Sequence, residues 1–195
     1  GSVPSSASHR VMAMRHHAWF LHNIRGDRFA AYQAYRELGA FSESDAVKVR
    51  CAIECAGLMM ELALSAKGSL SDCEQECTRI LAEFPEAPES YRATAALMRA
   101  EACLHAGENI LAENYLDDMI GAYPESDRET AMALYWKAKC QLQSERYNDA
   151  QATLNTLLAE PYASAGIYRD FDHQRRGAIL LEVADKHMNG GGTGQ

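Results

Sequence analysis

Apolar residues recur at helical spacing along most of this chain. The clearest segment runs from Gly107 to Pro124, where a turn-forming glycine precedes an apolar stripe and a helix-ending proline follows it. Its stripe comprises Leu111, Ala112, Tyr115, Leu116, Met119 and Ile120. The pattern recurs from Glu145 to Pro161, with a stripe of Tyr147, Ala150, Leu154, Leu157 and Leu158. Each copy predicts a short turn followed by an amphipathic helix.

The same periodicity predicts nine helices in all. The others span about 9–25, 28–38, 45–66, 71–84, 89–105, 126–143 and 168–187, and the two described above make up the set. Gly39 and Gly68 are expected to end the second and third helices, and Ser71 and Ser126 to open the fourth and seventh as capping boxes. The expected apolar anchors of the first helix are Met12, Trp19, Phe20 and Ile24. No stretch alternates with period two, so no sheet is expected.

Turn residues recur with a period of about 40 residues, which indicates two helices per repeat. They are Gly26, Gly68, Gly107 and Glu145, and the closing prolines Pro85, Pro124 and Pro161 follow a similar spacing. Hairpins of this kind bury their apolar faces against their neighbours. The sequence therefore predicts an all-α chain of about four stacked helical hairpins, with the last helix as a C-terminal cap.

The predicted domain organisation is simple. Residues 1–8 are expected to be a disordered segment, 9–188 a single helical repeat domain, and 189–195 a flexible Gly-rich tail. Gly1 and Ser2 resemble the remnant of an expression tag, so they are excluded from the fold prediction.

Composition limits the choice of partners. The formal net charge of −8 argues against nonspecific nucleic-acid binding and against bulk electrostatic docking on anionic membranes. No apolar run approaches the ~20 residues that span a bilayer, so direct membrane insertion is not expected. A protein or peptide partner and a homo-oligomer are both compatible with this composition, which does not choose between them.

The six cysteines are the first candidates for chemistry. Cys51 and Cys55 share one helix face, as do Cys73 and Cys77 on the next helix. Three readings stay open at this point: buried free thiols, an interhelical disulfide, or a tetrahedral zinc site. The spacing is not that of a usual zinc knuckle, so buried thiols are favoured and no cofactor is assigned.

Catalytic signatures are not found in the sequence. The histidines of the first helix lack an i, i+4 pair, and no HExxH, phosphate loop, GxSxG or Cys/His nucleophile pattern is present. The sequence therefore predicts a noncatalytic protein.

The repeated units resemble tetratricopeptide repeats (TPRs), which have a small residue in helix A, a tight turn, a small residue opening helix B and a final proline. Two stretches carry the resemblance, and it covers about 180 residues loosely. In residues 93–124 the matching positions are Ala100, Gly107, Ala112, Leu116, Met119 and Pro124. In residues 131–161 they are Ala138, Tyr147, Ala150, Leu154, Leu157 and Pro161. The resemblance implies an α-α superhelix, a right-handed solenoid.

The chain departs from the family pattern in two ways. Trp19 and Glu61 fall where helix A of the first two units should carry its small residue. The period also exceeds the family's 34 residues, which one extra helical turn per unit would explain. HEAT and armadillo repeats have similar periods, but the small residues and terminal prolines favour TPR.

Two phrases give a weaker similarity. FPEAPES and YPESDRE, each followed by an Ala-rich helix, resemble TPR proteins of bacterial envelopes, such as β-barrel assembly lipoproteins and the periplasmic Tol-system partner. The similarity implies a cell-envelope assembly and slightly favours a periplasmic or membrane-anchored location.

TPR stacks bind partners on a concave face lined by helix A residues. On the two matching units the resemblance assigns this partner-binding groove to Thr94, Leu97, Glu101, His105, Met132, Tyr135 and Lys139. Tyr135 is the best anchor candidate, because interface hot spots favour rigid aromatic residues. The Lys/Asn clamp for a C-terminal carboxylate is not found. A protein-binding scaffold is thus the favoured function, with a self-assembling repeat module as the alternative and a zinc- or redox-responsive module third.

Overall fold

The computed structural model describes residues 6–164 and 172–190, and every regular element in these ranges is helical. Contacts divide the chain into two units, Gly1–Ala102 and Cys103–Gln195, each described here by itself. The helices are α1 (Ser6–Asn23), α2 (Arg28–Phe41), α3 (Asp45–Leu64), α4 (Leu70–Glu83), α5 (Glu89–His105), α6 (Asn109–Ala122), α7 (Asp127–Gln143), α8 (Tyr147–Leu157) and α9 (His173–Gly190), with a short 3-10 helix η1 (Tyr162–Ser164) before α9. The predicted all-α helical repeat fold is confirmed.

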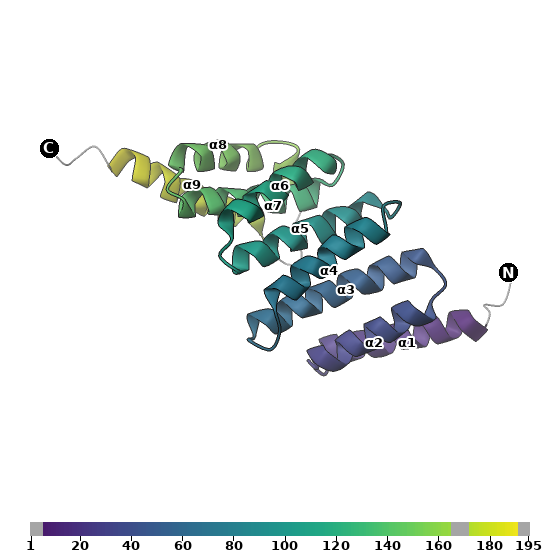
Figure 1. Ribbon diagram of the computed structural model, residues 1–195. Helices are drawn as coiled ribbons and strands as arrows, with labels where there is room; N and C mark the ends of the chain where they lie inside the picture. The colour runs from purple at the N-terminus through teal and green to yellow at the C-terminus, as the bar shows by residue number, and fades with distance from the viewer. Residues whose placement is uncertain (1–5, 165–171, 191–195) are drawn as a thin grey trace. The chain divides into compact units, whose positions relative to one another are not determined.

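In the first unit, successive helices pack side by side from α1 to α4 (Figure 1). Its interior has two apolar clusters. One joins α2 and α3 to α1 through side chains such as Ala18, Leu38 and Leu58. The other joins α3, α4 and α5 through side chains such as Ile53, Ile80 and Met98. Each helix pair therefore completes the core of its neighbour, as expected for stacked hairpins.

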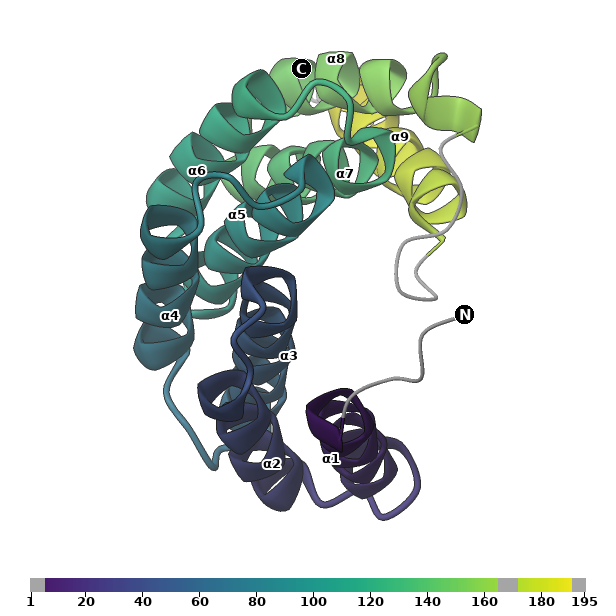
Figure 2. The same cartoon turned by 90° about the vertical axis from the view of Figure 1, so that its right-hand side faces the viewer.

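In the second unit, α7 packs against α6, α8 and α9, and α8 packs against α9. Figure 2 shows these helices in two layers, with α6 and α8 in one and α7 and α9 in the other. The core centres on Ala138, Leu154 and Leu157. Gly177 of α9 lies so close to α8 that an added Cβ would be 2.7 Å from Leu157 Cδ2, so glycine permits this helix contact.

The turns explain the helix ends. Gly107 ends α5 with a φ of 84°, a left-handed conformation that glycine adopts readily. Asp27 caps α2 by accepting a hydrogen bond from the Ala30 N–H at 3.0 Å. At the α3–α4 turn the left-handed residue is Ala66, so the helix ends before the predicted breaker Gly68.

Two predicted boundaries are wrong. Ser71 lies inside α4, and the cap is Ser69, whose extended backbone lets its side chain accept from the Asp72 N–H at 3.3 Å. Gly39 does not end α2, which continues to Phe41. A Cβ at Gly39 would be 3.4 Å from Cys51 Cβ, so this glycine allows close packing of α2 on α3.

α8 ends at Leu157, before the predicted Pro161, and Ser126 precedes α7 without the side-chain cap hydrogen bond of the predicted capping box. Other differences lie at the chain ends. α1 begins at Ser6, within the segment predicted to be disordered, and α9 continues to Gly190, into the predicted tail. The predicted start of the last helix, at 168, falls outside the described residues.

Candidate functional site

A groove in the first unit is the best-formed candidate site. It has α1 and α3 as its walls, α2 as its floor and Tyr91 of α5 at one edge, and it encloses about 1010 Å³. We call it the α1–α3 groove. Figure 2 shows α1 and α3 separated, with α2 beside both. The helices that form its walls are helix A of the first two hairpins.

Large apolar side chains line this groove and reach solvent. Trp19 and Met12 on α1 are 51% and 50% exposed, and half-buried Val11 and Val47 lie beside them. The expected apolar anchors of the first helix are all exposed, so that expectation is wrong: Met12, Trp19, Phe20 and Ile24. Within the described chain α1 packs mainly on α2, and Ala18 fills this contact. Most side chains of α1 are therefore exposed.

The register explains why Trp19 was misplaced. The α1–α2 loop comprises residues 24–27, one residue more than the α5–α6 and α7–α8 loops, 106–108 and 144–146. Because of this extra residue, the position of helix A that requires a small side chain is Ala18 rather than Trp19. Ala18 is fully buried. In the second hairpin the longer loop, 65–69, likewise leaves Glu61 on the surface.

The charges of the groove differ from those of the chain. Exposed Arg15 and Arg50 lie on opposite walls, and Glu54 is the one carboxylate in the lining, whereas the whole chain carries −8. His16 and His22 also line the groove. The wall side chains therefore provide a positive environment around apolar surface.

The floor and the α3 wall of the groove hold neutral groups. Tyr35 is 5% exposed, and burial, followed by the charge of Glu54, raises its pKa to about 12. Burial likewise raises the pKa of Cys51 to about 11. Both groups stay protonated near neutral pH, so neither Tyr35 of the floor nor Cys51 of the α3 wall serves as a nucleophile or a general base.

An ion-pair group lies beside the groove, which His22 also lines. Glu61 of α3 accepts from Arg28 Nε at 2.6 Å and lies 3.3 Å from His22 Nε2, so α1, α2 and α3 meet there. The Glu61 side chain is 40% exposed, which limits the stabilisation from these pairs to about 0–1 kcal/mol.

The residues predicted for the partner-binding groove lie in both units. In the first, Leu97 is fully buried, whereas Thr94 and Glu101 are half-buried, and Thr94 Oγ1 donates to the Ser90 carbonyl at 2.8 Å. Leu97 packs in the interior and offers no surface to a partner.

Three of the predicted residues come together in the second unit, around a tryptophan that the sequence analysis missed. His105 meets Trp136 edge-on at 6.0 Å between ring centroids, Tyr135 does so at 5.2 Å, and Lys139 Nζ lies 4.7 Å from the centre of the Trp136 ring. Burial, then Lys139, lowers the pKa of His105. We call these four residues the Trp136 cluster. The i, i+3 spacing of Trp136 and Lys139 on one helix face was the available signal for Trp136.

The residues at this surface of the second unit differ in how far they are buried. Tyr135 is 7% exposed and Met132 4%, so both serve mainly as packing residues. His105 is exposed, and Lys139 and Trp136 are half-buried. A partner at this surface would meet these last three.

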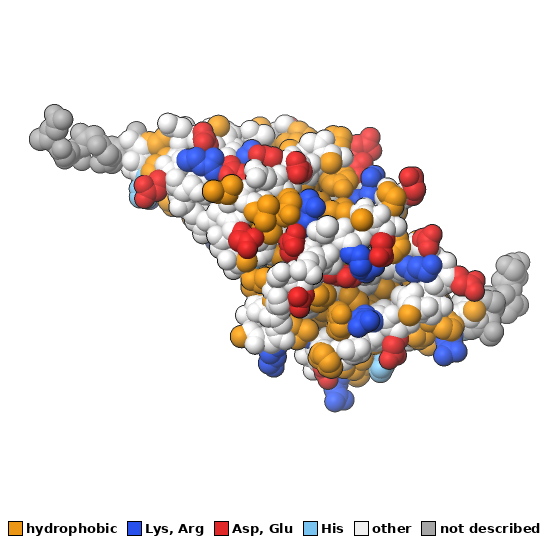
Figure 3. Space-filling view, viewed as in Figure 1, with side chains coloured by type: hydrophobic (Ala, Val, Ile, Leu, Met, Phe, Trp, Pro, Cys, Tyr) orange, Lys and Arg blue, Asp and Glu red, His pale blue; other side chains and the backbone are white. Residues whose placement is uncertain are grey.

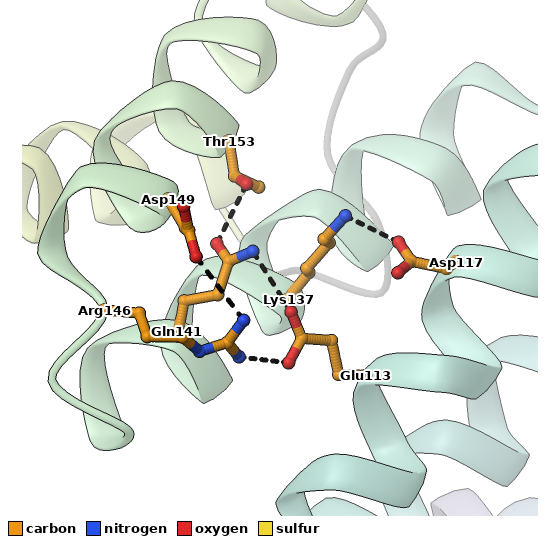
Figure 4. Close-up of polar contacts among 7 residues, drawn as sticks. All are labelled: Glu113, Asp117, Lys137, Gln141, Arg146, Asp149 and Thr153. Atoms are coloured by element: carbon orange, nitrogen blue, oxygen red, sulfur yellow. Dashed lines mark hydrogen bonds and ion pairs between the residues drawn. The ribbon is translucent and has the colours of Figure 1, made fainter.

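A polar network links three helices of the second unit (Figure 4). Gln141, 4% exposed, donates to Glu113 Oε1 at 3.2 Å and accepts from Thr153 Oγ1 at 2.9 Å. Arg146 pairs with the other Glu113 oxygen and with Asp149. Every member has a partner inside the network, so we interpret it as a structural tie between α6, α7 and α8.

All six cysteines are buried and free. The four predicted candidates divide between the two clusters of the first unit: Cys51 and Cys55 pack with α2, and Cys73 and Cys77 pack under α5. Cys73 Sγ lies 3.3 Å from the Ala56 carbonyl oxygen and donates to it. Within residues 6–164 and 172–190, no three His, Cys, Asp or Glu side chains are grouped as metal ligands would be.

No helix in the described ranges has the length and apolarity needed to cross a bilayer.

The fold and the groove define a TPR-like helical repeat protein, a class in which stacked hairpins present helix A side chains. The solved structure titled "MamA RS-1 ArsTM double mutant" is similar to this chain, with a TM-score of 0.60 and 12% sequence identity over 96% of this chain and 99% of that one. At this identity the similarity establishes the fold alone. No protein-family model matches the sequence, and no curated protein matches it.

Proposed function

We propose that this protein is a noncatalytic scaffold that binds a protein partner in the α1–α3 groove. One observation carries the proposal: the groove walls expose Trp19 and Met12 beside Arg15 and Arg50 in a chain with a net charge of −8. Exposed apolar side chains with a charged rim are typical of interaction sites.

The chemistry of the groove favours an acidic segment with an apolar anchor. Trp19 offers a rigid aromatic surface of the kind that dominates interface energetics. Arg15 and Arg50 can each donate to a carboxylate from opposite walls. A partner segment would therefore place one or two aliphatic side chains against Trp19 and carboxylates beside the arginines.

The Trp136 cluster is the second contact surface in this proposal. Lys139 and the exposed His105 edge would meet a carboxylate and an apolar side chain, the same ligand chemistry as in the α1–α3 groove. Thr94 and Glu101 stay predicted contacts of the helix A face. Assembly in a cell envelope also stays a prediction, since no described contact depends on the compartment.

Peptide binding tests the proposal. A fluorescein-labelled helical peptide with Leu and Ile anchors among Glu and Asp is titrated with dilute protein, and fluorescence anisotropy reports binding. We expect the Arg15→Glu/Arg50→Glu variant to weaken the affinity at least about tenfold, because it reverses the charge of both walls. Trp19→Ala is expected to weaken it by a similar factor.

Arg25→Glu is the matched control, because Arg25 is an exposed arginine of the same unit that does not line the groove. A peptide with Lys in place of every acid should not bind. Equal affinity of the groove variants and the wild type would disprove the proposal.

A further inference from the structure

The outer face of α6 carries an unusual exposed hydrophobic pair. Ile110 is 80% exposed, more than any other large hydrophobic residue of the described ranges, and the adjacent Leu111 is 37% exposed. Farther along the same helix, an added Cβ at Gly121 would meet nothing within 4 Å, so this part of the surface is open. An isolated exposed side chain is ordinary, whereas Ile110 and Leu111 expose apolar surface at neighbouring positions of one helix.

The charges of this helix complement those of the groove. Between its ends α6 contains Glu113, Asp117 and Asp118 and no Lys, Arg or His. The groove wall α1 has the opposite composition, with Arg10, Arg15 and four histidines and no Asp or Glu. For comparison, Figure 3 shows one face of the molecule, on which charged side chains of both signs are interspersed with hydrophobic ones.

Not all of these carboxylates are equally available. Glu113 is held in the polar network and Asp117 accepts from Lys137 Nζ at 2.6 Å. Asp118 and Glu108 are both exposed and flank the Ile110–Leu111 pair. The α6 edge, which we define as Glu108, Ile110, Leu111 and Asp118, therefore has the acidic and aliphatic character that the groove requires.

We propose that the partner of the α1–α3 groove is a second copy of this chain, which inserts its α6 edge there. This inference rests on the proposed function of the groove and names its occupant. Ile110 and Leu111 pack against Trp19 and Met12 of the other copy, and Asp118 and Glu108 lie beside its Arg15 and Arg50.

The two surfaces are different, so the contact is heterologous. Each copy keeps a free groove and a free α6 edge after one contact forms. Association therefore continues head to tail and gives open chains or a closed ring rather than a simple two-fold dimer.

Light scattering after size-exclusion chromatography, over a range of protein concentrations, tests the inference. The wild type is expected to show a mass that rises above the 21.5 kDa monomer as concentration increases. Ile110→Asp removes the apolar contact, keeps the acidity and places a carboxylate in the first turn of a helix, where it is tolerated. Both this variant and Arg15→Glu/Arg50→Glu are expected to weaken association at least about tenfold.

Mixing the two variants gives the sharpest test. The Ile110→Asp protein retains an intact groove, and the Arg15→Glu/Arg50→Glu protein retains an intact α6 edge. Each alone is expected to stay monomeric, whereas the mixture is expected to form a 1:1 complex that grows no further. Ile179→Asp is the control, since Ile179 is an exposed residue of α9, 54% accessible, outside both surfaces; circular dichroism confirms that all variants are folded.

The outcomes separate the two proposals. A wild-type mass that stays at the monomer value while the acidic peptide still binds the groove overturns the self-association but leaves the proposed function, with a different acidic protein as occupant. Self-association that survives in Ile110→Asp, or a mixture without a 1:1 complex, also overturns it. If Arg15→Glu/Arg50→Glu keeps both peptide binding and assembly, both proposals are overturned.

Discussion

At the scale of single residues, the buried cysteines are packing groups, and several of them have a raised pKa. Burial raises the pKa of Cys55 to about 12 and that of Cys140 to about 11. For Cys77, the hydrogen bond with Cys73 comes first, then burial, and both raise the pKa. The fold therefore stabilises the neutral thiol at these positions, and thiol reactivity is low in the native state.

These shifts predict a loss of stability in alkaline solution. In the unfolded chain a thiol ionises near pH 8.5, whereas in the folded chain Cys55 and Cys140 ionise at about 12 and 11. Their contribution to the free energy of unfolding is complete below the unfolded pKa and falls as pH rises through the window between the two values. Denaturant titrations between pH 8 and pH 11 measure this fall.

The Cys55→Ala variant provides the comparison, because it removes one of the shifted groups. Its free energy of unfolding should fall less steeply over the same pH range. A wild type and variant with the same pH dependence would show that Cys55 is not the source.

At the scale of helices, the polar network of the second unit predicts how two substitutions change the free energy of unfolding. The Glu113→Ala variant leaves the buried amide of Gln141 without its acceptor and is expected to lower the free energy of unfolding by about 1–3 kcal/mol. Asp149→Ala breaks an exposed pair at 3.5 Å and is expected to change it by less than about 1 kcal/mol. Chemical denaturation measures both variants, and equal effects would contradict the assignment of Glu113 as the central group.

The helices themselves were predictable because their signals are local. Apolar periodicity, turn glycines and closing prolines located the nine α-helices of the described ranges, and Gly107 adopts the left-handed conformation expected of it. Cap positions were less predictable: Ser69 and Ser71 are both serines in the right place, and only the backbone of Ser69 is extended. Sequence alone does not contain that distinction.

The candidate site was less predictable than the helices. The helix A face stays a predicted binding surface, and the candidate groove lies in the first two hairpins, where loop lengths differ, rather than at the predicted residues. Because the loop before α2 has one extra residue, Trp19 does not occupy the small-residue position of helix A. It is an exposed residue of the groove wall instead. Such a change depends on which neighbour covers each helix, and this is a tertiary property.

At the scale of the whole molecule, charge is unevenly distributed along the chain. Helix α1 has only basic and histidine side chains among its ionisable residues, whereas the chain as a whole carries −8. Any attraction between α1 of one copy and an acidic surface of another is therefore electrostatic in part and sensitive to salt.

The proposed assembly should consequently weaken as salt increases. Raising the ionic strength from about 0.1 M to about 1 M shortens the Debye length from about 10 Å to about 3 Å and screens the arginine–carboxylate contacts. We expect the average mass from light scattering to fall toward that of the monomer. The Ile110→Asp protein should show no such change, and assembly that strengthens with sodium chloride would indicate an apolar contact without charge pairing.

The burial of all six thiols has a consequence for the fate of the protein in an oxidising compartment. A correctly folded copy withholds every thiol from glutathione and from other chains, so its cysteines are protected from oxidation. A copy that unfolds releases six reactive groups at once and becomes covalently trapped by mispairing. Oxidants would thus distinguish folded from unfolded copies. Without a reducing agent, only molecules whose interior stays closed would be recovered.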